Sequence, residues 1–173
     1  MKKITPIWLG YIWMAAMAAA DPRLPISELG EGHHLPGVSE SNDTFALDEI
    51  DAPALVLIVF DLYCPTCQKS AGNIKRLAET IQESTPSIAV LGIGSGDTPF
   101  EAKKFRDKFK LPIPCVSDRE ESVSRQYGVK RTPSLIVLDR ADSGAPFTEI
   151  YRNEGYIGRE HIEAVMALVE ERK

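Results

Sequence analysis

A dense apolar run, Leu55–Phe60, is followed after three residues by the cysteine motif Cys64-Pro65-Thr66-Cys67. Six consecutive apolar residues, mostly β-branched or aromatic, favour a strand that is buried on both faces. After the motif, apolar residues recur at positions 71, 74, 77, 78 and 81, with charged and amide side chains between them. This spacing is typical of an amphipathic helix. The sequence therefore predicts a buried strand that leads through the cysteine pair directly into a long helix.

The rest of the chain shows the same two periodicities in turn. Capping patterns at Thr98-Pro99-Phe100-Glu101 and at Ser117–Glu120 predict helix starts. The expected strands are 44–47, 88–93, 111–116 and 135–138, with an edge strand at 147–151. One helix is expected from the first capping pattern to about Phe109 and another from the second to about Tyr127. A terminal amphipathic helix is expected through Ile162, Val165, Leu168 and Val169. Alternating strands and helices predict an α/β three-layer sandwich, with a mixed, mainly parallel sheet, helices on both faces and a C-terminal β-hairpin and helix.

The first twenty residues have the features of a secretory signal peptide. Lys2 and Lys3 precede an apolar run that ends in Ala18-Ala19-Ala20, which suits cleavage before Asp21. An uncleaved amino-terminal membrane anchor is the alternative. We therefore expect a signal peptide at 1–20, an amino-terminal segment rich in Pro, Gly, Glu and His at 21–43, and one domain at 44–173. The expected location is periplasmic or otherwise extracytoplasmic, in soluble form after cleavage.

Composition narrows the range of partners. The chain is 43% hydrophobic and 26% charged, as in an ordinary globular domain. Its formal net charge is −5, and loss of Lys2 and Lys3 with the leader makes it more negative. The basic residues are scattered among acidic ones, so a nucleic-acid partner is not expected.

The Cys64/Cys67 spacing suits a dithiol that alternates with a disulfide, because two intervening residues at a helix start keep the sulfur atoms close. Unpaired N–H groups and the helix dipole favour the thiolate of Cys64, which we expect to be the nucleophile. Cys67, one turn further along, is the expected resolving thiol. Pro65 suits the first helical position, and the Pro65-Thr66 dipeptide tunes the thiolate. The only cofactor expected is this redox-active disulfide.

A CxxC pair could also be half of a structural zinc site. The second half is missing, since no other CxxC occurs and the three histidines are His33, His34 and His161. No metal is therefore expected. The third cysteine, Cys115, is interpreted as a small buried hydrophobic residue. Gly92–Gly96 lacks the full spacing of a phosphate-binding loop and is interpreted as a flexible turn.

Between about Ala46 and Lys173 the chain resembles the thioredoxin superfamily, and within it the exported TlpA-like and cytochrome c maturation thioredoxins. The resemblance is carried by Val56–Phe60, Tyr63–Cys67, Val90–Ile93 and Tyr127–Pro133. It implies that Pro133 is a cis-proline facing the cysteines and that the Thr132 backbone pairs with a substrate strand. It also places Tyr63, Pro65 and Thr66 at the substrate-binding surface.

Three residues near the motif depart from that pattern. Tyr63 stands where the family usually has Trp, and Ser70 stands where the cytochrome-maturation branch often has an acidic residue. Asp61 could relay protons to Cys67 or raise a thiol pKa by repulsion, and a solvated carboxylate at a strand end is the competing interpretation.

The sequence therefore predicts an extracytoplasmic thiol:disulfide oxidoreductase that acts through Cys64 and Cys67. Its expected partners are protein thiols or disulfides, with apocytochrome c as one candidate and a membrane electron donor or acceptor as another. Two alternatives stay open. One is a peroxiredoxin-like thiol peroxidase, disfavoured by Asp61 at the position of that family's Thr; the other is a non-catalytic metal-delivery or protein-binding module on the same fold. The direction of electron flow is left open as well.

Overall fold

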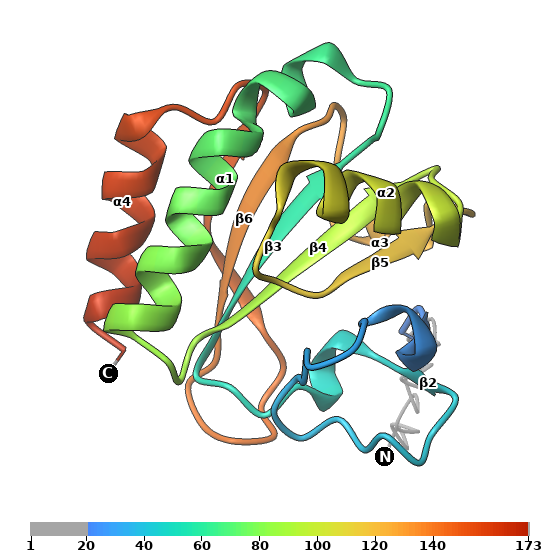
Figure 1. The fold of residues 1–173 in the computed structure, drawn as a ribbon. Coiled ribbons are helices and arrows are strands. Elements are labelled where there is room, and N and C mark those ends of the chain that lie inside the picture. The colour runs from blue at the N-terminus through green and yellow to red at the C-terminus, as the bar shows by residue number, and fades with distance from the viewer. Residues whose placement is uncertain (1–20, 173) are drawn as a thin grey trace, which may run out of the picture.

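The computed structural model describes residues 21–172, and the signal peptide predicted at 1–20 lies outside them. Five strands form the central sheet in the order β5-β4-β3-β6-β7 (Figure 1). Their bounds are β3 Ala54–Phe60, β4 Ala89–Ser95, β5 Cys115–Asp118, β6 Ser134–Asp139 and β7 Thr148–Glu154. The helices are α1 Pro65–Ser84, α2 Pro99–Phe109, α3 Ser122–Gln126 and α4 Arg159–Glu170. The sheet and its flanking helices confirm the predicted three-layer mixed α/β sandwich.

Strand direction changes across the sheet. β3 pairs in parallel with β4, and β4 with β5, whereas β6 runs antiparallel to both β3 and β7. Parallel and antiparallel pairings in this sheet are therefore equal in number, so the sheet is mixed, as predicted, but not mainly parallel, because β6 enters antiparallel to β3. The predicted C-terminal hairpin is β6–β7, with β7 at the edge, and α4 follows it.

The central strand β3 divides its side chains between two cores. Val56, Ile58 and Phe60 pack with buried residues of α1, α2 and α4. Leu55, Leu57 and Val59 pack on the other face. Every residue of β3 is buried, as a strand covered on both faces requires. The cysteine motif thus follows the carboxyl end of the buried central strand.

The amino-terminal segment covers much of the second face, which the sequence did not predict. It forms a two-stranded ribbon of β1, Leu24–Pro25, with β2, Thr44–Phe45, and two short 3₁₀ turns, η1 Ile26–Glu28 and η2 Leu47–Glu49. Its buried residues join the second core with α3, namely Leu24, Leu29, Leu35, Phe45, Leu47 and Ile50. In Figure 1 this segment lies beneath β4 and β5.

The β5–α3 region differs from the sequence prediction at both ends. β5 begins at Cys115 rather than at Leu111, because Pro112 and Pro114 lack the N–H groups that a strand ladder needs. The predicted capping role of Ser117 is also wrong. Its N–H and hydroxyl bind the Glu28 carboxylate, and α3 starts later, at Ser122.

The glycines interpreted as a flexible turn lie instead in and after β4. Gly92 and Gly94 are strand residues, and each is tightly packed. A Cβ at Gly92 would lie 2.6 Å from the Cys115 sulfur, and one at Gly94 would lie 2.9 Å from the Asp97 Cβ. Only Gly96, with φ of +72°, is placed in the turn that follows. The glycine pattern therefore reflects close packing of β4 against β5 and the β4–α2 corner.

Candidate active site

Cys64 is the residue that caps α1. Its backbone is extended, and its sulfur accepts a hydrogen bond from the Cys67 N–H at 3.4 Å. Pro65 follows at the first helical position, as predicted. Cys64 is half-buried and Cys67 is 0% exposed, and both are free thiols in this structure. The expected nucleophile is accessible from outside, whereas its partner lies inside the first turn.

The two thiols differ in acidity. Burial alone would raise the pKa of Cys64, but hydrogen bonds with the Thr132 side chain and the Cys67 and Thr66 backbone outweigh it, so that pKa is lowered. Burial raises the pKa of Cys67 to about 12. A thiolate therefore forms more readily at Cys64, as the position of this residue at the start of a helix predicts. This asymmetry is the one that a nucleophile and a resolving thiol require.

The loop before β6 lies directly against Cys64. The Cys64 thiol donates to the Thr132 carbonyl oxygen at 3.3 Å. The Thr132–Pro133 peptide bond is cis, and Pro133 is buried with its carbonyl accepting from the Gly155 N–H at 2.8 Å. The structure thus places the Thr132 backbone beside Cys64, with the cis bond to Pro133 directly after it.

The other residues expected at the substrate-binding surface lie next to Cys64 in the chain and are at least partly exposed. Tyr63 is 70% exposed, Pro65 is exposed and Thr66 is half-buried. The Tyr63 hydroxyl donates to the Glu101 carboxylate at 2.9 Å, and this bond is the main cause of a raised Tyr63 pKa. Glu101 also bonds the Thr98 N–H, which confirms the capping box predicted for α2. Tyr63 is therefore tied to the start of α2.

Asp61 is engaged in the turn before the motif. Its carboxylate accepts from the Tyr63 N–H at 2.7 Å, and its carbonyl accepts from the Cys64 N–H at 3.2 Å. Among the hydrogen bonds of residues 21–172, none joins the Asp61 carboxylate to Cys67. The proton relay stays a prediction, and the observed contact is a local one.

Two buried polar residues make contacts near the motif that the sequence did not predict. Asp97, at the β4–α2 corner, is 3% exposed and accepts from the Leu62 N–H at 3.1 Å. Ser70 is completely buried, and its hydroxyl accepts from the Ile157 N–H at 3.0 Å. Asp97 is 30 or more residues from the motif in sequence. No periodic pattern could have linked it to Cys64, because a tertiary contact makes the link.

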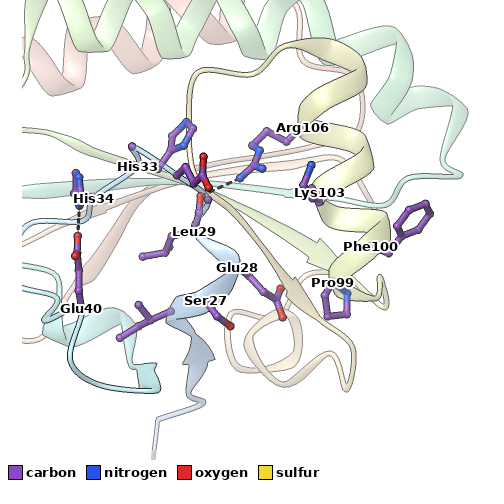
Figure 2. A pocket seen from close by; sticks show the side chains of 14 residues that line it. Ser27, Glu28, Leu29, His33, His34, Glu40, Pro99, Phe100, Lys103 and Arg106 are labelled. Carbon is purple, nitrogen blue, oxygen red and sulfur yellow. Dashed lines mark hydrogen bonds and ion pairs between the residues drawn. The ribbon is translucent and has the colours of Figure 1, made fainter.

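A cleft of about 1010 Å³ lies away from the thiols, between residues 26–34 and α2 (Figure 2). Figure 2 shows Arg106 donating to the Leu29 carbonyl oxygen, at 3.0 Å, and His34 paired with Glu40. His33 lines the same cleft. Within the part of the chain that the structure describes, no group of three or more His, Cys, Asp or Glu side chains is placed to hold a metal ion. The third histidine, His161, accepts from the Gly158 N–H at the start of α4.

Cys115 lies in β5, away from the cysteine pair. It is 1% exposed and packs against Gly92, and burial raises its pKa to about 12. Its contacts fit the predicted interpretation as a small buried residue.

Fold and site together define a thioredoxin-fold protein in which a helix-capping thiol is paired with a buried one. The AhpC/TSA family model matches residues 32–150, and the chain belongs to that family.

Individual relatives extend the comparison. The thiol-disulfide oxidoreductase ResA of Halalkalibacterium halodurans is 21% identical over 97 residues, which cover 56% of this chain and 54% of that protein. A Coxiella burnetii protein named as the peroxiredoxin bcp is 26% identical over 125 residues, which cover 72% of this chain and 76% of that protein. This chain spans about half the length of the ResA relatives that it matches.

Among solved structures, StoA of Bacillus subtilis superposes with a TM-score of 0.57 at 14% identity, covering 77% of this chain and 95% of StoA. At that identity the likeness shows the fold.

Proposed function

We propose that the protein is an extracytoplasmic thiol:disulfide oxidoreductase that exchanges disulfides with protein substrates through Cys64 and Cys67. The observation that carries the proposal is the pairing of an accessible thiol of lowered pKa with a buried thiol whose pKa is raised to about 12. Relatives named as thiol-disulfide oxidoreductases support it.

The chemistry follows from the positions of the two sulfurs. The Cys64 thiolate attacks a substrate disulfide, a Cys64–substrate bond forms, and the other substrate sulfur leaves as a thiolate. Cys67 then loses its proton and attacks the Cys64 sulfur, so the second substrate thiolate leaves and a Cys64–Cys67 disulfide remains. The substrate disulfide gains two electrons and the dithiol loses two. The same steps in reverse deliver a disulfide to a substrate.

The surroundings of Cys64 suit a polypeptide substrate. The Thr132 carbonyl lies 3.3 Å from the sulfur, so a backbone bound at that loop would be held next to the nucleophile. Tyr63, which directly precedes Cys64, offers an exposed aromatic ring. An apocytochrome c and a membrane electron donor or acceptor are candidate partners in this scheme. None of the helices in residues 21–172 has the length and apolar character to cross a membrane.

Trapping of the mixed disulfide tests the proposal. Cys67→Ser should accumulate a covalent adduct with a disulfide-containing protein through Cys64, because the resolving step is lost. Cys64→Ser should trap none, and Cys115→Ser should turn over like the native protein. Absence of an adduct in Cys67→Ser, together with no disulfide exchange by the native protein, would rule out the proposal.

The similarity to a protein assigned as a peroxiredoxin makes thiol peroxidase activity the second candidate. Peroxide consumption that persists in Cys67→Ser, without disulfide exchange, would favour it. Copper or zinc bound stoichiometrically by the reduced protein, again without exchange, would instead favour a metal-delivery module.

A further inference from the structure

The turn that leads into Cys64 is held by side chains from other parts of the fold. The Leu62 N–H donates to both carboxylate oxygens of Asp97, at 3.1 and 3.3 Å. The Leu62 carbonyl accepts from the Gln68 side-chain amide at 2.8 Å. Leu62 is itself buried, so these bonds replace bonds to water. Both backbone polar groups of Leu62, two residues before Cys64, are therefore fixed by side chains.

Asp97 is well suited to act as an anchor, because its own position is tightly defined. Its N–H donates to the Gly94 carbonyl oxygen at 3.2 Å, and the next residue, Thr98, caps α2. A Cβ on Gly94 would lie 2.9 Å from the Asp97 Cβ and carboxylate, so the Asp97 side chain packs against Gly94 more closely than a larger residue there would allow. The carboxylate thus reaches the Leu62 N–H from a rigid corner between β4 and α2.

The surroundings of Asp97 disfavour the ionised form of its carboxyl group. Burial raises the pKa of Asp97 to about 7, the nearby Asp61 and Glu101 carboxylates act in the same direction, and the Leu62 N–H opposes them. An apolar side chain would avoid this penalty but would leave the Leu62 N–H buried without an acceptor, which costs about 1–3 kcal/mol. The acceptor role therefore accounts for an acid at a place that disfavours its charge.

We propose that Asp97 is a positioning residue for Cys64. By accepting the Leu62 N–H, it fixes the turn before the motif and so keeps the Cys64 sulfur at the amino terminus of α1 and beside Thr132. There the Thr132 side chain and the Cys67 and Thr66 backbone lower the Cys64 pKa. This inference deepens the proposed function and rests on it only for the identity of the reactive thiol. The effect of Asp97 on the reactivity of Cys64 can be measured without a substrate.

The experiment is the pH profile of iodoacetamide alkylation at Cys64 in the reduced protein. Asp97→Ala should move the midpoint upward by about one pH unit, and below the midpoint the rate falls by up to about tenfold. Asp97→Asn keeps an acceptor oxygen and should retain the native midpoint. If Asp97→Ala does not fold, as judged by its melting temperature, Asp97→Ser replaces it, because the serine hydroxyl lies one bond closer to the backbone than the carboxylate oxygens and loses their contact with the Leu62 N–H.

Asp118 provides a matched control. It is also 3% exposed, and its carboxylate accepts the Val123 and Ser124 N–H groups at the start of α3, so Asp118→Ala disturbs a similar buried anchor that does not hold Leu62. It should lower the melting temperature and keep the native midpoint.

Three results would overturn the inference. They are a native profile in both Asp97→Ala and Asp97→Ser, an equal shift in Asp97→Asn, and an equal shift in Asp118→Ala. Disulfide exchange measured on the same samples separates this inference from the proposed function. A native protein without exchange but with a normal Cys64 profile contradicts only the proposed function.

Discussion

Cys64 and Cys67 differ in burial and in acidity, and this difference predicts how a small alkylating reagent will distinguish them. The thiolate is the species that reacts with iodoacetamide. The capping thiol has a lowered pKa and is partly exposed, whereas its partner is 0% exposed. At pH 8 the reagent should therefore modify Cys64 in the folded, reduced protein and leave Cys67 as a thiol.

The size of the effect follows from the acidity of Cys67. With a pKa of about 12, it is ionised at pH 8 to about one part in ten thousand, whereas an unperturbed cysteine with a pKa of about 8.5 is ionised to about a quarter. Ionisation alone makes Cys67 react about two to three thousand times more slowly than an unperturbed cysteine. Cys115 has the same raised pKa and is 1% exposed, so it should be equally slow.

Mass spectrometry after timed quenching measures the prediction. One label, at Cys64, should appear within the time in which the unfolded protein in guanidinium takes up three. Cys64→Ser, the matched variant, should take up no fast label at all. Modification of Cys67 at a rate within tenfold of Cys64 would refute the reasoning, because it would mean that the two thiols do not differ in environment as the structure shows.

Three further predictions test contacts near the cysteines and at the cleft beside α2. Ser70→Ala leaves a buried backbone N–H without its acceptor and should lower the free energy of unfolding by about 1–3 kcal/mol in urea titrations; an unchanged midpoint would contradict this. Gly30 has φ of +92°, and a Cβ there would lie 2.2 Å from the Arg106 guanidinium, whereas Gly32 has φ of +76° and open space. Arg106 would have to move and give up its buried bond to the Leu29 carbonyl oxygen. Gly30→Ala should therefore be less stable than Gly32→Ala, which incurs only the backbone cost of about 1–2 kcal/mol; equal melting temperatures would refute the contact. Asp97 has a folded-state pKa of about 7, above the unfolded value of about 3.9, so the folded state holds its proton more tightly. Its contribution to the free energy of unfolding therefore falls as pH rises from about 4 to 7, by up to about 4 kcal/mol. Asp97→Asn should remove that decrease, and parallel pH profiles for the two proteins would show that the carboxyl is not perturbed.

The features that the sequence predicted are those specified by neighbouring residues. The apolar run of β3, the cysteine motif and the helical spacing of α1 lie within one continuous stretch, so strand, turn and helix could be placed from it. The capping box of α2 is likewise contained in Thr98–Glu101 and was confirmed by its two hydrogen bonds. Local patterns of this kind need no knowledge of which elements meet in space.

The features that were missed depend on contacts between distant segments. Asp97 reaches Leu62 across 35 positions, and Ser70 reaches Ile157 across 87. The leucines of the amino-terminal segment are too far apart to show a period, yet they are buried against the sheet face that they cover. In each case the partner is brought close by the fold, so the isolated sequence carries no signal for the contact.

Equilibrium with glutathione tests most directly whether Cys64 and Cys67 form one redox couple. The purified protein is held at a series of reduced-to-oxidised glutathione ratios, quenched with acid, alkylated and weighed. We expect a single two-electron transition between two free thiols and a Cys64–Cys67 disulfide, with Cys115 remaining a thiol throughout, and loss of the transition in Cys64→Ser and in Cys67→Ser. Thiols that stay reduced at every ratio, or that take up glutathione independently without forming the internal disulfide, would contradict the account.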